Sequence, residues 1–243
     1  MIFFKMIKKI YSIGHLKNKF KIKTSNKFLR ALFFPALLFF SLPAFSHTMA
    51  YDFQSMSKSG IGWVYMKMGF THIIPLGFDH ILFILGIFLL KPQLRTVIWQ
   101  ATAFTVAHSI TLGLAIYGYI SPQPAIIEPV IALSIIFIGI ENIITRDLKW
   151  WRLMVIFLFG LIHGCGFAGA LAGAGLPEKD FLLGLVSFNA GVEAGQITVI
   201  LIAYFLFGKW FADKSWYRKR ITIPASLCIS LIAFYWTIER VFY

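Results

Sequence analysis

The chain has 243 residues, of which 58% are hydrophobic and only 14% are charged, whereas soluble domains carry about 25% charged residues. Together with a mean hydropathy of +0.76, this composition excludes an ordinary water-soluble protein. The net charge of +13 does not indicate nucleic-acid binding, because much of the basic excess lies in the first 30 residues, which hold nine Lys and Arg and no acidic residue.

The first 46 residues have the composition of a cleavable secretory signal peptide. A cationic stretch precedes the apolar run Ala31–Leu42, and Ala44 and Ser46 provide the small residues of a cleavage site. The 12 residues of the apolar run rise about 18 Å as a helix, which is too short for a hydrocarbon core of about 30 Å. Cleavage after Ser46 would make His47 the new N-terminus, and an uncleaved anchor is the alternative.

The remainder of the chain has the pattern of an all-α, polytopic transmembrane helix bundle. We predict an extracytoplasmic segment with an interfacial helix over 47–70 and the bundle over 71–243. About six spans fit the apolar runs, and their connections are short. The expected spans lie near 71–90, 97–119, 125–145, 151–173, 181–207 and 221–239.

Basic residues alternate between the loops and predict the orientation of the bundle. Lys91 and Arg95 follow the first span. The next inner turn carries Arg146, Lys149 and Arg152, and the third carries a cluster that includes Lys214 and Arg218. The protein is expected in a bacterial cytoplasmic (inner) membrane. Because loops rich in Lys and Arg stay in the cytoplasm, both termini are expected on the extracytoplasmic side.

The first span is expected to be broken. Pro75 and Gly77 interrupt the apolar pattern immediately before Asp79 and His80. Non-helical backbone at membrane depth is tolerated where it lines a cavity, so the break predicts a site at this point of the chain.

Ionisable residues inside spans are costly and mark function. Neutral imidazoles and carboxylates are ligands for nickel, cobalt, zinc, manganese or iron. Packing by hydrogen bonds between helices is the alternative for any single histidine, and Cys165 and Cys228 have no metal-binding spacing. The residues that we predict to form a metal path are Asp79, His80, His108, Glu141, His163 and Glu193, with Asn189 and Gln196 on the face of Glu193.

Small residues predict which helices approach closely. Gly160 and Gly164 flank His163, and Gly191 and Gly195 flank Glu193, in the spacing that permits tight helix contacts. We therefore predict that His163 and Glu193 share one site near mid-membrane.

Several of these segments resemble the HupE/UreJ family of hydrogenase and urease accessory membrane proteins. The resemblance rests on Gly77-Phe-Asp79-His80, on Thr102-Ala-Phe-Thr-Val-Ala-His108, on Glu141-Asn142, on Phe159-Gly-Leu-Ile-His163-Gly164 and on Asn189-Ala-Gly-Val-Glu193. It covers roughly residues 60–240. It implies a multi-helix inner-membrane protein that handles nickel or cobalt for metalloenzyme maturation, with Asp79, His80 and His72 in the signature.

His72 departs from that signature, because it lies five residues before Gly77 rather than four and its proline is Pro75. The predicted function is transport or delivery of a divalent transition metal, with nickel or cobalt favoured and zinc as an alternative. Expected partners are the ion, the lipid bilayer and metalloenzyme maturation proteins, and not nucleic acid. A non-transporting metal-binding accessory protein and an intramembrane metalloenzyme are the rivals, but no catalytic motif such as His-Glu-x-x-His supports an enzyme.

Overall fold

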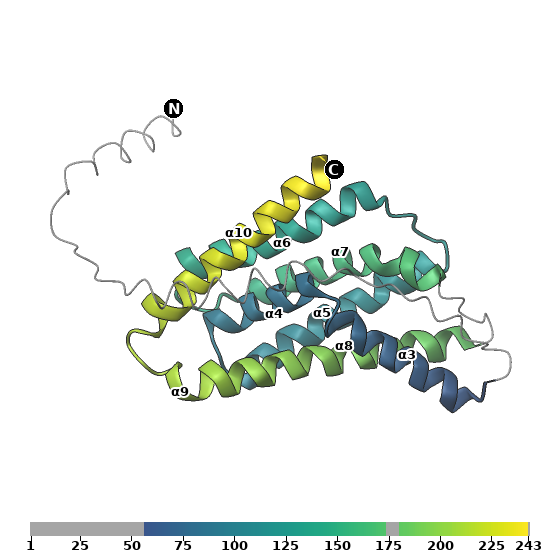
Figure 1. Ribbon diagram of the computed structural model, residues 1–243, viewed down its shortest axis with the longest axis horizontal. Coiled ribbons are helices and arrows are strands. Elements are labelled where there is room, and N and C mark those ends of the chain that lie inside the picture. The colour runs from purple at the N-terminus through teal and green to yellow at the C-terminus, as the bar shows by residue number, and fades with distance from the viewer. Residues whose placement is uncertain (1–55, 174–179, 243) are drawn as a thin grey trace. The chain divides into compact units, whose positions relative to one another are not determined.

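A computed structural model describes residues 56–173 and 180–242, which belong to one compact unit, Thr48–Tyr243. The predicted signal peptide lies outside the described residues. The described part is helical and contains no strand, as expected. Its principal helices are α3 (Lys58–Ile73), α4 (Phe78–Leu90), α5 (Leu94–Ile116), α6 (Pro124–Ile144), α7 (Arg152–Gly173), α8 (Phe181–Ala203) and α10 (Ile223–Phe242) (Figure 1).

Short irregular pieces join the last two long helices. The π-helical turn η3 (Tyr204–Gly208) and the short α9 (Lys209–Phe211) continue α8, and a second π-turn, η4 (Arg218–Thr222), leads into α10. Together, Phe181–Phe211 and Arg218–Phe242 are long apolar helices of 31 and 25 residues. Of the basic residues predicted to precede the last span, Lys214 lies between these two helices and Arg218 begins the second one.

Four of the predicted spans are confirmed as helices long and apolar enough to cross a membrane. Within the described residues, these helices are Leu94–Ile116, Pro124–Ile144, Phe181–Phe211 and Arg218–Phe242. A fifth is added if α3 and α4 form one broken span, and the stretch Arg152–Phe167 of α7 is a shorter apolar helix. Six spans remain a prediction.

The predicted break in the first span is confirmed. Helix α3 begins behind Ser57, whose side chain accepts a hydrogen bond from Gly60 N, and it ends at Ile73, before Pro75. The axis turns by 67° before α4 starts. The chain therefore brings the end of α3 and the start of α4 to the same place in the bundle.

Helix α3 packs lengthwise along α8. Gly62 lies against Leu183 and Ser187 at one end of the contact, and Ile73 lies against Gly195 at the other, so the two helices run in parallel. The structure contains no membrane, so the predicted interfacial position of this segment stays untested. Its close contact with a membrane-spanning helix is a feature that the sequence pattern did not indicate.

Two further pairs complete the bundle: α5 with α7, and α6 with α10 (Figure 1). A side chain at Gly164 would collide with the carbonyl oxygen of His108, so only glycine lets α7 approach α5 this closely. Large apolar side chains remain exposed on the outer faces, among them Leu182, Val186, Leu231 and Phe234. Such surfaces need lipid rather than water around them.

Candidate metal centre

Four histidines from four different helices meet in the interior of the bundle. His80 lies at the centre, with ring centroids 4.7 Å from His72, 5.0 Å from His163 and 5.9 Å from His108. Three of the rings, those of His72, His80 and His108, each offer a nitrogen within 4.8 Å of the others. We call these four residues the histidine cluster. It unites four of the residues predicted from the sequence.

The broken span accounts for two members of the cluster. His72 belongs to the last turn of α3, and His80 belongs to the first turn of α4. A side chain at Gly77 would collide with the backbone carbonyl of His72, so glycine permits the tight reversal between them. The other two members come from the α5–α7 pair, whose close approach at Gly164 brings His163 toward His108.

Hydrogen bonds orient two of the rings. The Nδ1 atom of His80 lies 3.1 Å from Asp79 Oδ1, and that of His108 lies 3.3 Å from Asn189 Oδ1. The Asn189 amide donates to the Leu185 carbonyl at 2.8 Å, so its oxygen is the acceptor for His108. Each ring therefore donates from Nδ1 and keeps a lone pair on Nε2. Metal-binding histidines use this arrangement, in which the second nitrogen is held by a carboxylate or carbonyl.

His163 is oriented in the opposite sense. Its Nε2 lies 3.0 Å from Ser134 Oγ, and Ser134 donates its own hydrogen to the Ile131 carbonyl at 2.7 Å. The hydroxyl oxygen therefore accepts from His163 Nε2, and the lone pair of this imidazole lies on Nδ1.

Every ring of the histidine cluster has a buried nitrogen without a hydrogen-bond partner. These atoms are Nε2 of His72, His80 and His108, and Nδ1 of His163. Buried polar atoms are nearly always satisfied, so four exceptions in one cluster need an explanation. Neutral imidazoles with bare nitrogens are the form in which histidine binds metal, which makes a cation the simplest missing partner.

Aromatic rings enclose the cluster. Phe167 lies 3.9 Å from His72 between ring centroids, and Phe104 lies 4.9 Å from His163. Phe83 lies 5.3 Å from His163 on another side. The histidine cluster is therefore surrounded by apolar rings on several sides.

Glu193 lies outside the histidine cluster. Its two carboxylate oxygens accept hydrogen bonds from the hydroxyls of Thr102 and Thr105, each at 2.6 Å. Among the described residues, no hydrogen bond joins Glu193 to His163, and a shared ion site for the two stays a prediction. Both hydroxyls come from α5, and Asn189, one turn from Glu193 on α8, contacts His108 instead.

The glycine faces of α7 and α8 do not pack against each other. Gly160 and Gly164 of α7 lie against Phe104 and His108 of α5. Gly191 of α8 lies against Met66 of α3. The two small-residue surfaces therefore have different partner helices, and the assumption that they face one another is wrong.

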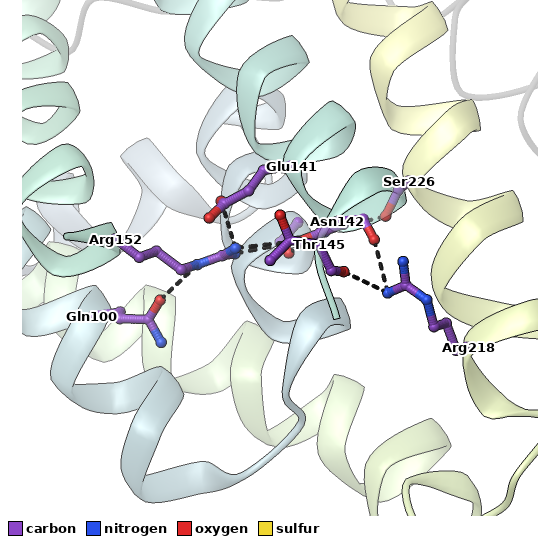
Figure 2. A network of polar contacts seen from close by, with 8 residues as sticks. Gln100, Glu141, Asn142, Thr145, Arg152, Arg218 and Ser226 are labelled. Atoms are coloured by element: carbon purple, nitrogen blue, oxygen red, sulfur yellow. Dashed lines mark hydrogen bonds and ion pairs between the residues drawn. The ribbon is translucent and has the colours of Figure 1, made fainter. Parts of the chain in front are cut away.

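Glu141 also lies apart from the cluster, in a network with a buried arginine (Figure 2). Arg152 is 1% exposed, and its Nη1 lies 2.5 Å from Glu141 Oε2. Its Nε donates to Gln100 Oε1 at 3.1 Å, and both of its terminal nitrogens lie 3.4 Å from Asn142 Oδ1. The sequence predicts Arg152 to be a loop charge, because its position at the edge of an apolar run gives no signal of burial.

Arg218 extends the polar region toward α10. Its guanidinium donates to the carbonyls of Thr145 at 2.6 Å and Ile143 at 2.8 Å, which satisfies the end of α6. Asn142 donates to Gly86 O at 2.7 Å and to Ser226 Oγ at 3.1 Å. The network thus ties α4, α6, α7 and α10 together at one end of the bundle (Figure 2).

The family described as HupE / UreJ protein matches residues 49–240, which is most of the chain. The chain belongs to the HupE/UreJ family. Neither a curated protein nor a solved structure matches it. The resemblance inferred from short motifs is therefore confirmed over the whole bundle.

HupE/UreJ proteins are linked to the handling of nickel and cobalt as accessory or transport proteins. In this HupE/UreJ chain, the segments that carried the resemblance contribute His80, His108 and His163 to one cluster. His72 joins them despite its altered spacing, because the break between α3 and α4 places it beside His80.

Proposed function

We propose that this HupE/UreJ protein carries a divalent transition-metal ion across the cytoplasmic membrane. The observation that supports this most directly is the set of four buried, unpartnered imidazole nitrogens inside a bundle of membrane-length helices. In the proposed role, the ion is the transported substrate and is bound during transport. The protein thereby supports maturation of a metalloenzyme.

Nickel or cobalt is the favoured ion. Imidazole donors suit nickel, cobalt and zinc, whereas no cysteine thiolate contributes to the described cluster. The family's link to nickel and cobalt favours these two over zinc. His72, His80 and His108 are the proposed ligands, with His163 as a fourth.

Asp79 and Asn189 are proposed to position ligands. Asp79 accepts from the backbone N of His80 at 2.8 Å and faces its ring as well. Its second oxygen, Oδ2, lies 3.9 Å from Arg240, so the carboxylate links the cluster to the end of α10. Asn189 holds His108 in the tautomer that leaves Nε2 bare.

The basic end of the bundle is proposed to face the cytoplasm. Arg152 and Arg218 gather at the end where α6 finishes. Lys91 follows the end of α4, and Arg95 lies in the first turn of α5. The positive-inside rule then directs the start of α4 to the outside. An ion entering from that side reaches His80 first and the arginine network last.

Reconstitution into liposomes tests this function. We expect the wild-type protein to bind one equivalent of nickel or cobalt tightly and to accumulate it inside the vesicles. His80→Ala and His108→Ala should each remove tight binding and uptake, because each deletes a bare nitrogen donor. Thr237→Ala is the control, since its hydroxyl donates only within its own helix, to the Ala233 carbonyl at 2.8 Å.

Two results would contradict the proposal. Tight binding without accumulation would identify a metal-binding accessory protein, the rival reading. Unchanged metal stoichiometry in His80→Ala, accompanied by lower thermal stability in detergent, would show that the histidines only pack the helices together.

A further inference from the structure

A polar strip continues from the histidine cluster along the facing surfaces of α5 and α8. The first contact in it is between His108 and Asn189. The next contacts join Glu193 to Thr105 and Thr102. Because residue numbers fall along α5 while they rise along α8, the two helices are antiparallel. The strip therefore runs from the cluster toward the start of α5, which is the basic end of the bundle.

The contacts of Glu193 with Thr105 and Thr102 lie close to the contact between His108 and Asn189. Thr105 and Thr102 precede His108 by one and nearly two helical turns, which corresponds to about 4.5 Å and 9 Å along the axis. Glu193 follows Asn189 by one turn, about 6 Å. An ion leaving the cluster in this direction would meet oxygen atoms within a few ångströms.

Gln196 provides an independent sign of a ligand at this level. It is fully buried, yet neither its amide oxygen nor its amide nitrogen has a hydrogen-bond partner. It follows Glu193 by three residues, so it projects from the same face of α8. A buried amide without any partner is costly, and a cation bound by its oxygen would remove part of that cost.

The carboxylate of Glu193 also lacks a positive partner. Glu141 is paired with Arg152, but in the part of the chain that the structure describes no Lys, Arg or His forms an ion pair with Glu193. The two threonine hydrogen bonds are short, as in charge-assisted bonds to a carboxylate. A half-buried acid in a membrane bundle, held by hydroxyls and facing no basic side chain, is suited to receive a mobile cation.

We propose that Glu193, Thr102, Thr105 and Gln196 form a second, oxygen-lined binding station for the divalent cation. This inference rests on the proposed transport function. The ion would pass from nitrogen ligands in the histidine cluster to oxygen ligands one to two turns further along α5. Oxygen donors hold nickel, cobalt and zinc less strongly than imidazoles do, so the second station favours release toward the basic end.

Cobalt binding and uptake, measured on the same preparations, test the second station. We expect the wild-type protein to show one tight site with nitrogen ligands in its visible spectrum, and one weaker site. Glu193→Gln should keep the tight site and its spectrum, lose the weaker site, and slow uptake at least about tenfold, within the range caused by losing a group that supports a metal site. Gln196→Leu should act in the same direction. Glu193→Asp, which keeps a carboxylate, should retain more uptake than Glu193→Gln.

Thr198→Ala is the matched control on the same helix, because its exposed hydroxyl donates to the Ala194 carbonyl of α8. The second station is refuted if Glu193→Gln retains wild-type uptake, or if it loses the tight nitrogen-ligand site. The proposed transport function fails separately, and this inference with it, if neither the wild type nor Thr198→Ala binds cobalt tightly.

Discussion

At the scale of single residues, the histidine cluster depends on side chains that orient its rings and that we do not propose as ligands. The sequence predicts Asn189 to be part of the metal path. The amide oxygen of Asn189 accepts a hydrogen bond from His108 Nδ1. Ser134 plays the same part for His163. Both groups decide which ring nitrogen carries the proton, and that choice determines whether a bare nitrogen faces the cluster.

A substitution at Asn189 separates positioning from ligation. Asn189→Ala should lower the affinity for nickel or cobalt by roughly 10- to 100-fold, the usual effect of removing a group that orients a metal-binding histidine. It should not abolish binding, whereas His108→Ala should. Equilibrium dialysis of both variants measures the difference. Equal, complete loss in the two variants would indicate that Asn189 is itself a ligand.

At the scale of helices, the buried pair of Arg152 and Glu141 joins the start of α7 to the end of α6. Both side chains are almost fully buried, and Gln100 and Asn142 add hydrogen bonds to the guanidinium. Removing one partner of a buried ion pair leaves an uncompensated charge, which is far more costly than removing both.

The double-mutant cycle tests whether Glu141 is structural or a metal ligand. Arg152→Met or Glu141→Leu alone should destabilise the protein by about 3–5 kcal/mol, and the double variant should recover much of that loss. Unfolding in detergent provides the measurement. Metal stoichiometry should be unchanged in all variants that fold. Loss of metal binding in Glu141→Leu with little change in stability would identify Glu141 as a metal ligand.

At the scale of the whole molecule, the contacts show which helix ends lie together. Arg240, near the end of α10, donates to the Glu128 carbonyl at 3.0 Å, close to the start of α6. At the opposite end, Arg218 reaches the last carbonyls of α6. The C-terminal end of the described chain therefore shares a side with the starts of α4 and α6, as an alternating topology requires.

Reporter fusions at Tyr243 test the absolute orientation. Alkaline phosphatase, which is active outside the cytoplasm, should be active, and a fluorescent protein that folds only in the cytoplasm should be dark. A control fusion in the loop after Phe211 should give the opposite result. A fluorescent C-terminal fusion would overturn the extracytoplasmic C-terminus and the prediction of six spans.

The sequence by itself determined the class of the protein and the candidate metal-binding residues. Apolar runs between basic loops are local properties, and they specify membrane helices without knowledge of how those helices pack. Pro75 and Gly77 likewise indicated the break, because proline cannot continue a helix and glycine permits backbone conformations that other residues avoid. The short motifs around His80, His108 and His163 were enough to indicate the family.

Only the tertiary structure decided which of these residues belong together. Periodicity places Glu193 and His163 on helix faces, but it does not say which helix each face meets. Gly160 and Gly164 of α7 face α5, and Gly191 and Gly195 of α8 face α3, so the two glycine faces have separate partner helices. Arg152 looked like a loop charge until α6 and α5 supplied Glu141 and Gln100. Helix pairing depends on complementary surfaces far apart in the chain, and for that reason local patterns could not determine it.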